Sequence, residues 1–109
     1  MEDMEMLEKA AAAAGIEHDG WVDGTRHRHG GLERIEDGLF AVKLWNPLED
    51  DGDAFGLMVK LGLDCCFRTI WGEVLAEYNR HRVTEMCGDD PHAAARRAIV
   101  RAVAEKWGK

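Results

Sequence analysis

The chain has 109 residues, and its 14 basic and 21 acidic side chains give a formal net charge of −7. This length predicts one domain, residues 1–109, with enough residues to bury a hydrophobic core. Its longest apolar run, Ala10 to Ala14, is far too short to span a bilayer, and the acidic start MEDMEMLEK is unlike a secretory signal. We therefore expect a cytoplasmic protein with no membrane association.

The excess of negative charge bears on the class of partner. An acidic surface repels phosphate backbones, so direct nucleic-acid binding is disfavoured, and a basic partner or a small ligand met by a local basic patch is favoured. The three cysteines are Cys65, Cys66 and Cys87. Because their number is odd and two are adjacent, they predict reduced thiols and no disulfide framework.

The first part of the chain predicts a helix followed by strands. Residues 2–14 are rich in helix formers and carry one apolar face, and Gly15 suits the left-handed end of that helix. Residues 17–31 predict a short strand near Trp21 and Val22, then an irregular loop. Residues 32–35 and 39–45 predict two strands joined by a turn at residues 36–38. The predicted face of the first helix holds Met4, Leu7, Ala11 and Ala14.

The centre of the chain predicts a turn and a short helix. Proline fixes φ and pushes the preceding residue into extended geometry, so the chain turns at Asn46-Pro47. Asp50 or Asp51 caps the helix that follows, and Gly62 ends it. Its apolar stripe holds Ala54, Leu57, Met58 and Leu61.

The last part predicts more strands and a long helix. Residues 65–71 and 74–78 pair around Gly72-Glu73, residues 79–82 form a polar turn, and residues 83–87 form another strand. Asp89 or Asp90 caps the final helix, which has Pro91 at its first position and runs to about Trp107. Its buried stripe holds Ala95, Ala98, Ile99, Ala102 and Val103.

The order of predicted elements is therefore helix, three strands, helix, three strands, helix. This order is typical of an α+β fold in which helices cover an antiparallel sheet. Trp45 and Trp71, at strand ends, are expected to border the core.

Two segments carry a resemblance to a known family. They are WNPLEDDGDAFGLMVKLGLD (Trp45 to Asp64) and DDPHAAARRAIVRAVAEKWG (Asp89 to Gly108). With LEKAAAAAGI (Leu7 to Ile16), they resemble the phage ABA sandwich domain, a small module encoded by tailed bacteriophages and prophages. The resemblance covers about half the chain. It implies helix, sheet, helix layering (an α-β-α sandwich) and a phage accessory gene, and it brings no catalytic residues with it.

Two basic clusters are candidate binding sites. Arg97 and Arg101 lie one helical turn apart with Arg96 beside them, a spacing that suits bidentate binding of a phosphate or carboxylate, with Trp45 as a stacking surface. The alternative is that Arg101 pairs with Glu105 and the others meet solvent or the acidic central helix.

The second cluster is Arg26-His27-Arg28-His29, with Trp21 nearby. In a strand the two histidines would share one face, which suits a metal ion, but they lack a third ligand nearby, although His18 is not far off in sequence. Contact with nucleic acid or a nucleotide is a further alternative. A solvated loop that contacts a partner is the favoured interpretation. Trp21 lies between glycines and is a candidate interface anchor, because tryptophan is enriched at binding hot spots.

The acidic run Glu49, Asp50, Asp51 and Asp53 does not continue into a calcium-binding loop, and helix capping explains it. No side chain stands in a recognisable nucleophile motif, although Cys66 or Cys87 beside His81 would supply a thiol and a base. We therefore expect no enzymatic activity, no cofactor and no metal.

These features favour a phage-encoded accessory protein in the infected host cell that acts by binding. The preferred partner is a host protein of an antiviral defence, met through an acidic surface. Alternatives are sequestration of a small anionic ligand such as a signalling nucleotide, or a phage structural or DNA-handling role. A homodimer through an exposed strand edge is also compatible with the sequence.

Overall fold

The computed structural model describes residues 2–26, 28–34, 43–68 and 70–107. Within these ranges the order of elements is helix, three strands, helix, three strands, helix, as predicted. The α+β class is therefore confirmed. The elements are α1 (Asp3–Ala14), β1 (His18–Val22), β2 (Gly31–Arg34), β3 (Leu44–Trp45), α2 (Asp51–Leu61), β4 (Asp64–Arg68), β5 (Glu73–Tyr78), β6 (His81–Met86) and α3 (Pro91–Trp107).

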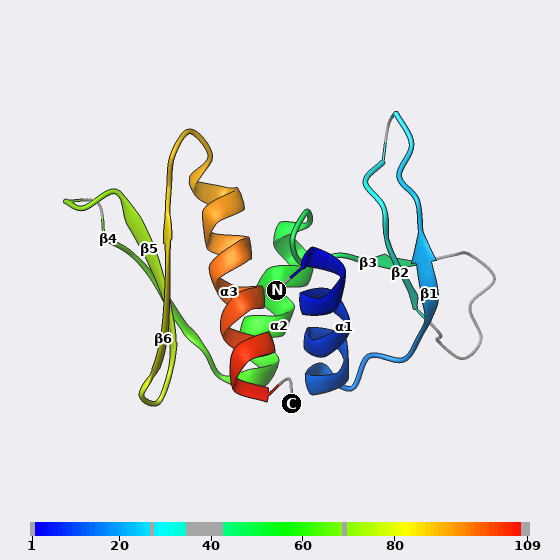
Figure 1. Cartoon of the computed structure of the whole chain (residues 1–109), viewed down its shortest axis with the longest axis horizontal. Coiled ribbons are helices and arrows are strands. Elements are labelled where there is room, and N and C mark those ends of the chain that lie inside the picture. Colours follow the sequence, from blue (N-terminus) through cyan, green and yellow to red (C-terminus); the bar gives the residue numbers. More distant parts are fainter. Residues whose placement is uncertain (1, 27, 35–42, 69, 108–109) are drawn as a thin grey trace.

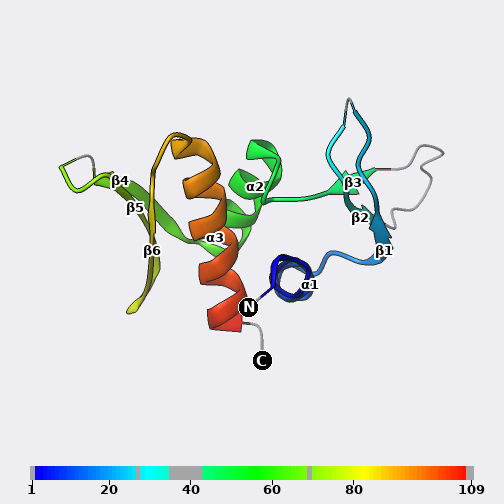
Figure 2. The same ribbon diagram turned by 45° about the horizontal axis from the view of Figure 1, so that its top comes forward.

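The strands form two antiparallel sheets of three, in the orders β1-β2-β3 and β4-β5-β6. Both views place these sheets at opposite ends of the molecule with the three helices between them (Figures 1 and 2). The pairing is antiparallel, as predicted, but the strands are divided between two outer sheets, and the helices do not cover a single shared one. The physical reason is that α3 packs on β5 and β6 with one side and on α1 and α2 with the other.

The helix ends follow the predicted local chemistry. Asp50 Oδ1 accepts a hydrogen bond from the backbone N–H of Asp53 at 2.8 Å, and Asp90 Oδ1 accepts one from Ala93 at 3.0 Å. These bonds satisfy backbone donors that the first turn of a helix leaves unpaired. Gly15 and Gly62 end α1 and α2 in the left-handed region, at φ 71° and 73°.

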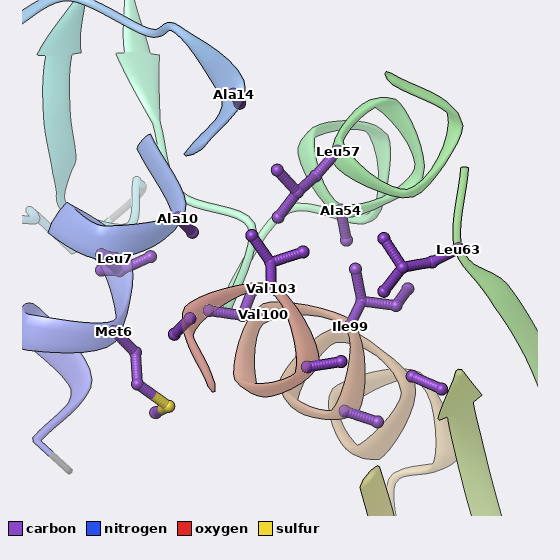
Figure 3. Packing of buried hydrophobic residues seen from close by; sticks show 14 of the residues in the cluster. Met6, Leu7, Ala10, Ala14, Ala54, Leu57, Leu63, Ile99, Val100 and Val103 are labelled. Atoms are coloured by element: carbon purple, nitrogen blue, oxygen red, sulfur yellow. The ribbon is translucent and has the colours of Figure 1, made fainter. Parts of the chain in front are cut away.

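The core is built around α3. Figure 3 shows Ile99, Val100 and Val103 of this helix directed towards α1 and α2. Because α3 is covered on two sides, its buried surface is wider than the predicted stripe: Ala94, Val100 and Ala104 are also buried, while Ala95 is only half-buried. Alanines on α1 and α3 keep these helices close, which excludes water from the centre of the domain.

A buried asparagine joins the first sheet to α2. Asn46 is 3% exposed, and its Nδ2 donates to the carbonyl oxygen of Gly30 at 2.8 Å. Its backbone N–H donates to Asp53 Oδ2 at 2.9 Å, and its Oδ1 accepts from the N–H of Leu48 at 3.1 Å. Three of its polar groups are thereby paired, as burial demands.

Some predicted bounds change. β4 ends at Arg68, so Trp71 lies in the turn before β5 and is exposed, which contradicts its predicted place beside the core. The predicted turn at residues 79–82 shortens to Asn79 and Arg80, because β6 already begins at His81. The short strand predicted near Trp21 and Val22 is β1, which begins earlier, at His18, and the irregular loop predicted after it contains a bridge between Thr25 and Arg28. The turn predicted at residues 36–38 and most of the strand predicted at residues 39–45 lie outside the described residues.

Candidate functional site

An open cleft of about 350 Å³ lies between α2, α3 and β4. Its walls are mostly apolar, and two large aromatic side chains border it, Phe55 of α2 at 62% exposure and Phe67 of β4 at 52%. Exposed aromatic rings beside a concave apolar surface are a feature of binding sites. The lining side chains come from α2 (Asp51, Ala54, Phe55, Met58), β4 (Cys65, Phe67) and α3 (His92, Ala95, Arg96, Ile99).

One polar cluster forms the rim of this cleft at the N-terminal ends of α2 and α3. Arg96 donates from Nε to the carbonyl oxygen of Leu48 at 2.8 Å and from Nη1 to Asp51 Oδ1 at 2.6 Å. His92 Nδ1 lies 3.1 Å from Asp51 Oδ2. The bond from Arg96, followed by the one from His92, lowers the pKa of Asp51, because both bonds favour the charged form of this carboxylate. The cluster holds the start of α3 against the start of α2.

Cys65 places a thiol in the same cleft as His92 and Asp51, the residue types of a thiol, base and carboxylate arrangement. Burial, with a smaller contribution from neighbouring Cys66, raises the pKa of the Cys65 thiol. A nucleophilic cysteine needs the opposite shift, because the thiolate is the reactive form. The protonated thiol and the apolar walls therefore suit binding better than nucleophilic chemistry.

The arginines predicted to bind an anion are all paired inside the protein. Arg97 Nη2 lies 3.0 Å from Asp3 Oδ1, and Arg101 Nε donates to Glu105 Oε2 at 2.8 Å. Arg101 also bonds Glu85. The arginines therefore already hold carboxylates, including the Arg101–Glu105 pair that the sequence offered as the alternative.

Trp45, the predicted stacking surface, does not join these arginines. It is 4% exposed and lies in the core. Of the arginines, Arg96 borders the cleft at α2, α3 and β4, whereas Trp45 borders a different cavity. A phosphate clamp made of Arg97, Arg101 and Trp45 is therefore not assembled in this structure.

The other predicted cluster lies on the β1–β2 hairpin, which projects from the first sheet (Figure 1). Arg26 and Arg28 are exposed there, as expected for a partner-contacting loop. Trp21 is partly exposed on β1, and its Nε1 donates to Asp23 Oδ1 at 2.9 Å. His29 is half-buried, with Nδ1 2.9 Å from the carbonyl oxygen of Gly30, and His27 lies outside the described residues.

A second cavity of about 270 Å³ lies between α1, α2 and the first sheet. Trp45, Arg34 and Lys60 line it together with Asp53, so it combines an aromatic ring, two cations and one carboxylate. Burial raises the pKa of Asp53, and the backbone N–H of Asn46 opposes that shift. Neither Arg34 nor Lys60 was predicted from the sequence, because the two residues, which are 26 positions apart, line one cavity only in the folded chain.

The two aromatic residues of the cleft, Phe55 and Phe67, were not predicted from the sequence, although one signal was present. The predicted stripe of α2 leaves Phe55 and Val59 on the opposite face, where two large apolar side chains one turn apart are unusual. Phe67 and Cys65 gave no comparable signal, because the run CCFRTIW has no clear alternation.

Among the described residues no three His, Cys, Asp or Glu side chains group as metal ligands would, and no helix is both long and apolar enough to cross a membrane. No protein-family model matches the chain, and neither a curated protein nor a solved structure matches it.

Proposed function

We propose that this protein acts by binding another protein, and that the cleft between α2, α3 and β4 is where it binds. The observation that carries the proposal is the exposure of Phe55 and Phe67 on either side of an open apolar cleft. Aromatic side chains held on rigid elements bring large apolar area to an interface at a small cost in conformational entropy.

The charge of the chain indicates the chemistry of the partner. The net charge is −7, the carboxylate of Asp51 lines the cleft, and further exposed carboxylates precede the starts of α2 and α3. A segment with apolar side chains for the cleft and basic side chains for its acidic surroundings is complementary to this surface. The exposed carboxylates that precede these helix starts in sequence are Glu49, Asp89 and Asp90.

The biological setting rests on the resemblance of residues 45–64 and 89–108 to the phage ABA sandwich domain. It supports a phage-encoded accessory protein in the infected host cell, whose partner is a host protein of an antiviral defence. A small, acidic domain with a protonated cleft thiol and paired arginines is better suited to occupying a partner's surface than to turnover.

The experiment is a capture of partners from infected host cells with two matched variants. Phe55→Ser and Val59→Ser both change exposed apolar residues of α2, at 62% and 61% exposure, but only Phe55 lines the cleft. We expect Phe55→Ser to weaken binding of the recovered partner by about tenfold or more, as for a hot-spot aromatic, and Val59→Ser to leave it unchanged.

Salt supplies an independent measurement on the recovered pair. If the carboxylates act as proposed, affinity falls between about 50 mM and about 300 mM salt, because exposed charges are screened. Circular dichroism checks that both variants fold. Equal binding by the two variants, or affinity that does not respond to salt, would overturn the proposal.

A second candidate function, binding of a small anionic ligand such as a nucleotide, is favoured by the cavity that holds Arg34, Lys60 and Trp45. It differs from the predicted arginine site in that its two cations and its aromatic ring line one cavity. Calorimetry against a nucleotide panel tests it, with Lys60→Ala as the variant that loses binding and Lys43→Ala, an exposed lysine outside the cavity lining, as the control.

A further inference from the structure

The strand β4 forms an open edge of the second sheet. Among the described residues it pairs with β5 alone, so the other side of Asp64–Arg68 has no strand beside it. An open edge presents backbone N–H and C=O groups that accept a further strand, and proteins usually protect such edges. β4 has neither a proline nor a bulge in its pairing with β5.

The sequence of this edge is complementary to itself. When two identical strands pair antiparallel about a two-fold axis, the axis must lie midway between one residue and the same residue of the second copy. Hydrogen-bonded and non-hydrogen-bonded residue pairs alternate along the ladder, so an axis between two successive pairs would superimpose one kind of pair on the other. For the sequence Asp-Cys-Cys-Phe-Arg, only an axis at Cys66 pairs all five residues. Asp64 then lies opposite Arg68 of the second copy, and Cys65 lies opposite Phe67 of the second copy.

Each of these pairs is favourable. Asp64 and Arg68 have opposite charges and stand on the same face of the strand as Cys66, because side chains alternate. Arg68 already lies 3.6 Å from Glu73 and stacks on Trp71, yet its side chain is 36% exposed and has further N–H donors to offer. On the other face the Phe67 ring meets a small thiol.

The exposed apolar side chains near β4 fit the same pairing. Ile70 and Trp71 follow the end of β4 and are 87% and 60% exposed, and with Phe67 and Arg68 they line a small cavity of about 220 Å³. If the same pairing continued beyond β4, Ile70 and Trp71 would lie opposite Gly62 and Leu61 of the second copy, where α2 leads into β4. Val59 is exposed in the last part of that helix.

The other edge strand, β6, offers a poorer match. It has six residues, so a residue-centred axis leaves at least one unpaired. Its Glu85 is held by Arg101, and its His81 lies 3.4 Å from Glu105. These side chains face α3 and are not available to a second copy.

We infer that the protein forms a symmetric homodimer in which two β4 strands pair antiparallel about Cys66, joining two three-stranded sheets into one of six strands. The occupant of this edge is a second copy of the chain. A two-fold axis perpendicular to the sheet keeps both sets of helices on one face, so the two binding clefts face the same side. The inference rests on the strand edge and its own complementarity; Cys65 and Phe67, which it places opposite one another, also line the cleft between α2, α3 and β4.

A charge swap tests the register by sedimentation velocity over a concentration series. Asp64→Arg and Arg68→Asp each place like charges opposite one another twice per dimer, and each should raise the dimer dissociation constant by about tenfold or more. The double variant Asp64→Arg/Arg68→Asp restores opposite charges and should return within about threefold of the wild type. Arg82→Asp, an exposed substitution on β6, is the control that leaves dimerisation unchanged.

Cross-linking at Cys66 gives a test that needs no change of charge. A short bis-maleimide should link two wild-type copies and two Cys87→Ser copies, but not two Cys66→Ser copies. A wild-type protein that sediments as a monomer at every concentration would overturn the inference. So would a double swap that fails to restore the dimer, or cross-linking that persists in Cys66→Ser.

Discussion

The side chain of Asn46 donates a hydrogen bond to the carbonyl oxygen of Gly30 across 16 positions of sequence, at 2.8 Å and out of contact with solvent. This bond fastens the β1–β2 hairpin to the turn that leads into α2. The same asparagine accepts from the N–H of Leu48, so one side chain orients both the sheet and the turn.

Replacement of Asn46 by alanine should therefore destabilise the fold. It removes the buried donor to the Gly30 carbonyl, which keeps only the contact with His29 Nδ1, and it removes the acceptor of the Leu48 N–H, so we expect a loss of about 1–2 kcal/mol in the free energy of unfolding. Urea unfolding measures it. Asn79→Gly is the control, because Asn79 is exposed with a φ of 53° that glycine adopts easily. A similar loss in both variants would contradict this role of Asn46.

Substitution of alanine for two glycines should change the stability of the protein in opposite directions. A Cβ on Gly30 would lie 2.6 Å from Trp21 Cζ2 and 2.8 Å from the carbonyl oxygen of Val22, so Gly30→Ala must displace the hairpin. A Cβ on Gly56 meets nothing within 4 Å in the middle of α2. We expect Gly56→Ala to raise stability by about 0.5–1 kcal/mol and Gly30→Ala to lower it, as measured by thermal unfolding. Stabilisation by Gly30→Ala would show that the hairpin has room there.

Two carboxylates in the first turn of α2 should give opposite dependences on pH. The bonds from Arg96 and His92 lower the pKa of Asp51, whereas burial raises the pKa of Asp53, from the ordinary value of 3.8 in each case. The contribution of Asp51 to stability is fully present above about pH 3.8, and it is lost as the pH falls through the lower pKa that Asp51 has in the folded protein. The contribution of Asp53 to stability is fully present below about pH 3.8, and it is lost as the pH rises through the higher pKa that Asp53 has in the folded protein.

The matching variants are Asp51→Asn and Asp53→Asn, with urea unfolding followed from about pH 3 to about pH 7. Relative to the wild type, the deficit of Asp51→Asn should shrink as pH falls. The stability of Asp53→Asn relative to the wild type should rise as pH rises, because the amide carries no charge to bury. Parallel curves for the two variants would contradict the assigned environments.

Alanine substitutions at two helix valines, one buried and one exposed, should have different effects on stability. Val103 is 0% exposed at the centre of α3, whereas Val59 is 61% exposed on α2. Val103→Ala should cost about 2 kcal/mol, from lost apolar burial and the space left behind. Val59→Ala should change stability by less than about 0.5 kcal/mol, because alanine is the better helix former and little burial is lost. Equal effects in chemical denaturation would mean that α3 is not the centre of the core.

The local chemistry of the chain was predictable from sequence because it acts over a few residues. Asp50 and Asp90 cap their helices because an acceptor three positions before a free N–H reaches it, and Gly62 ends α2 because it adopts a positive φ without steric cost. The ion pair between Arg101 and Glu105 was also predictable, because residues four positions apart lie on the same face of a helix. The order of helices and strands followed from such signals.

Only the tertiary structure decided which strands share a sheet and which charges meet. Alternation tells which way a side chain points but not which strand lies beside it, so the division into two outer sheets depends on α3 packing between them. The bonds of Arg101 to Glu85 and of Arg96 to Asp51 join elements far apart in sequence. For the same physical reason the cleft of Phe55 and Phe67 exists only once α2, α3 and β4 are brought together by burial of the common core.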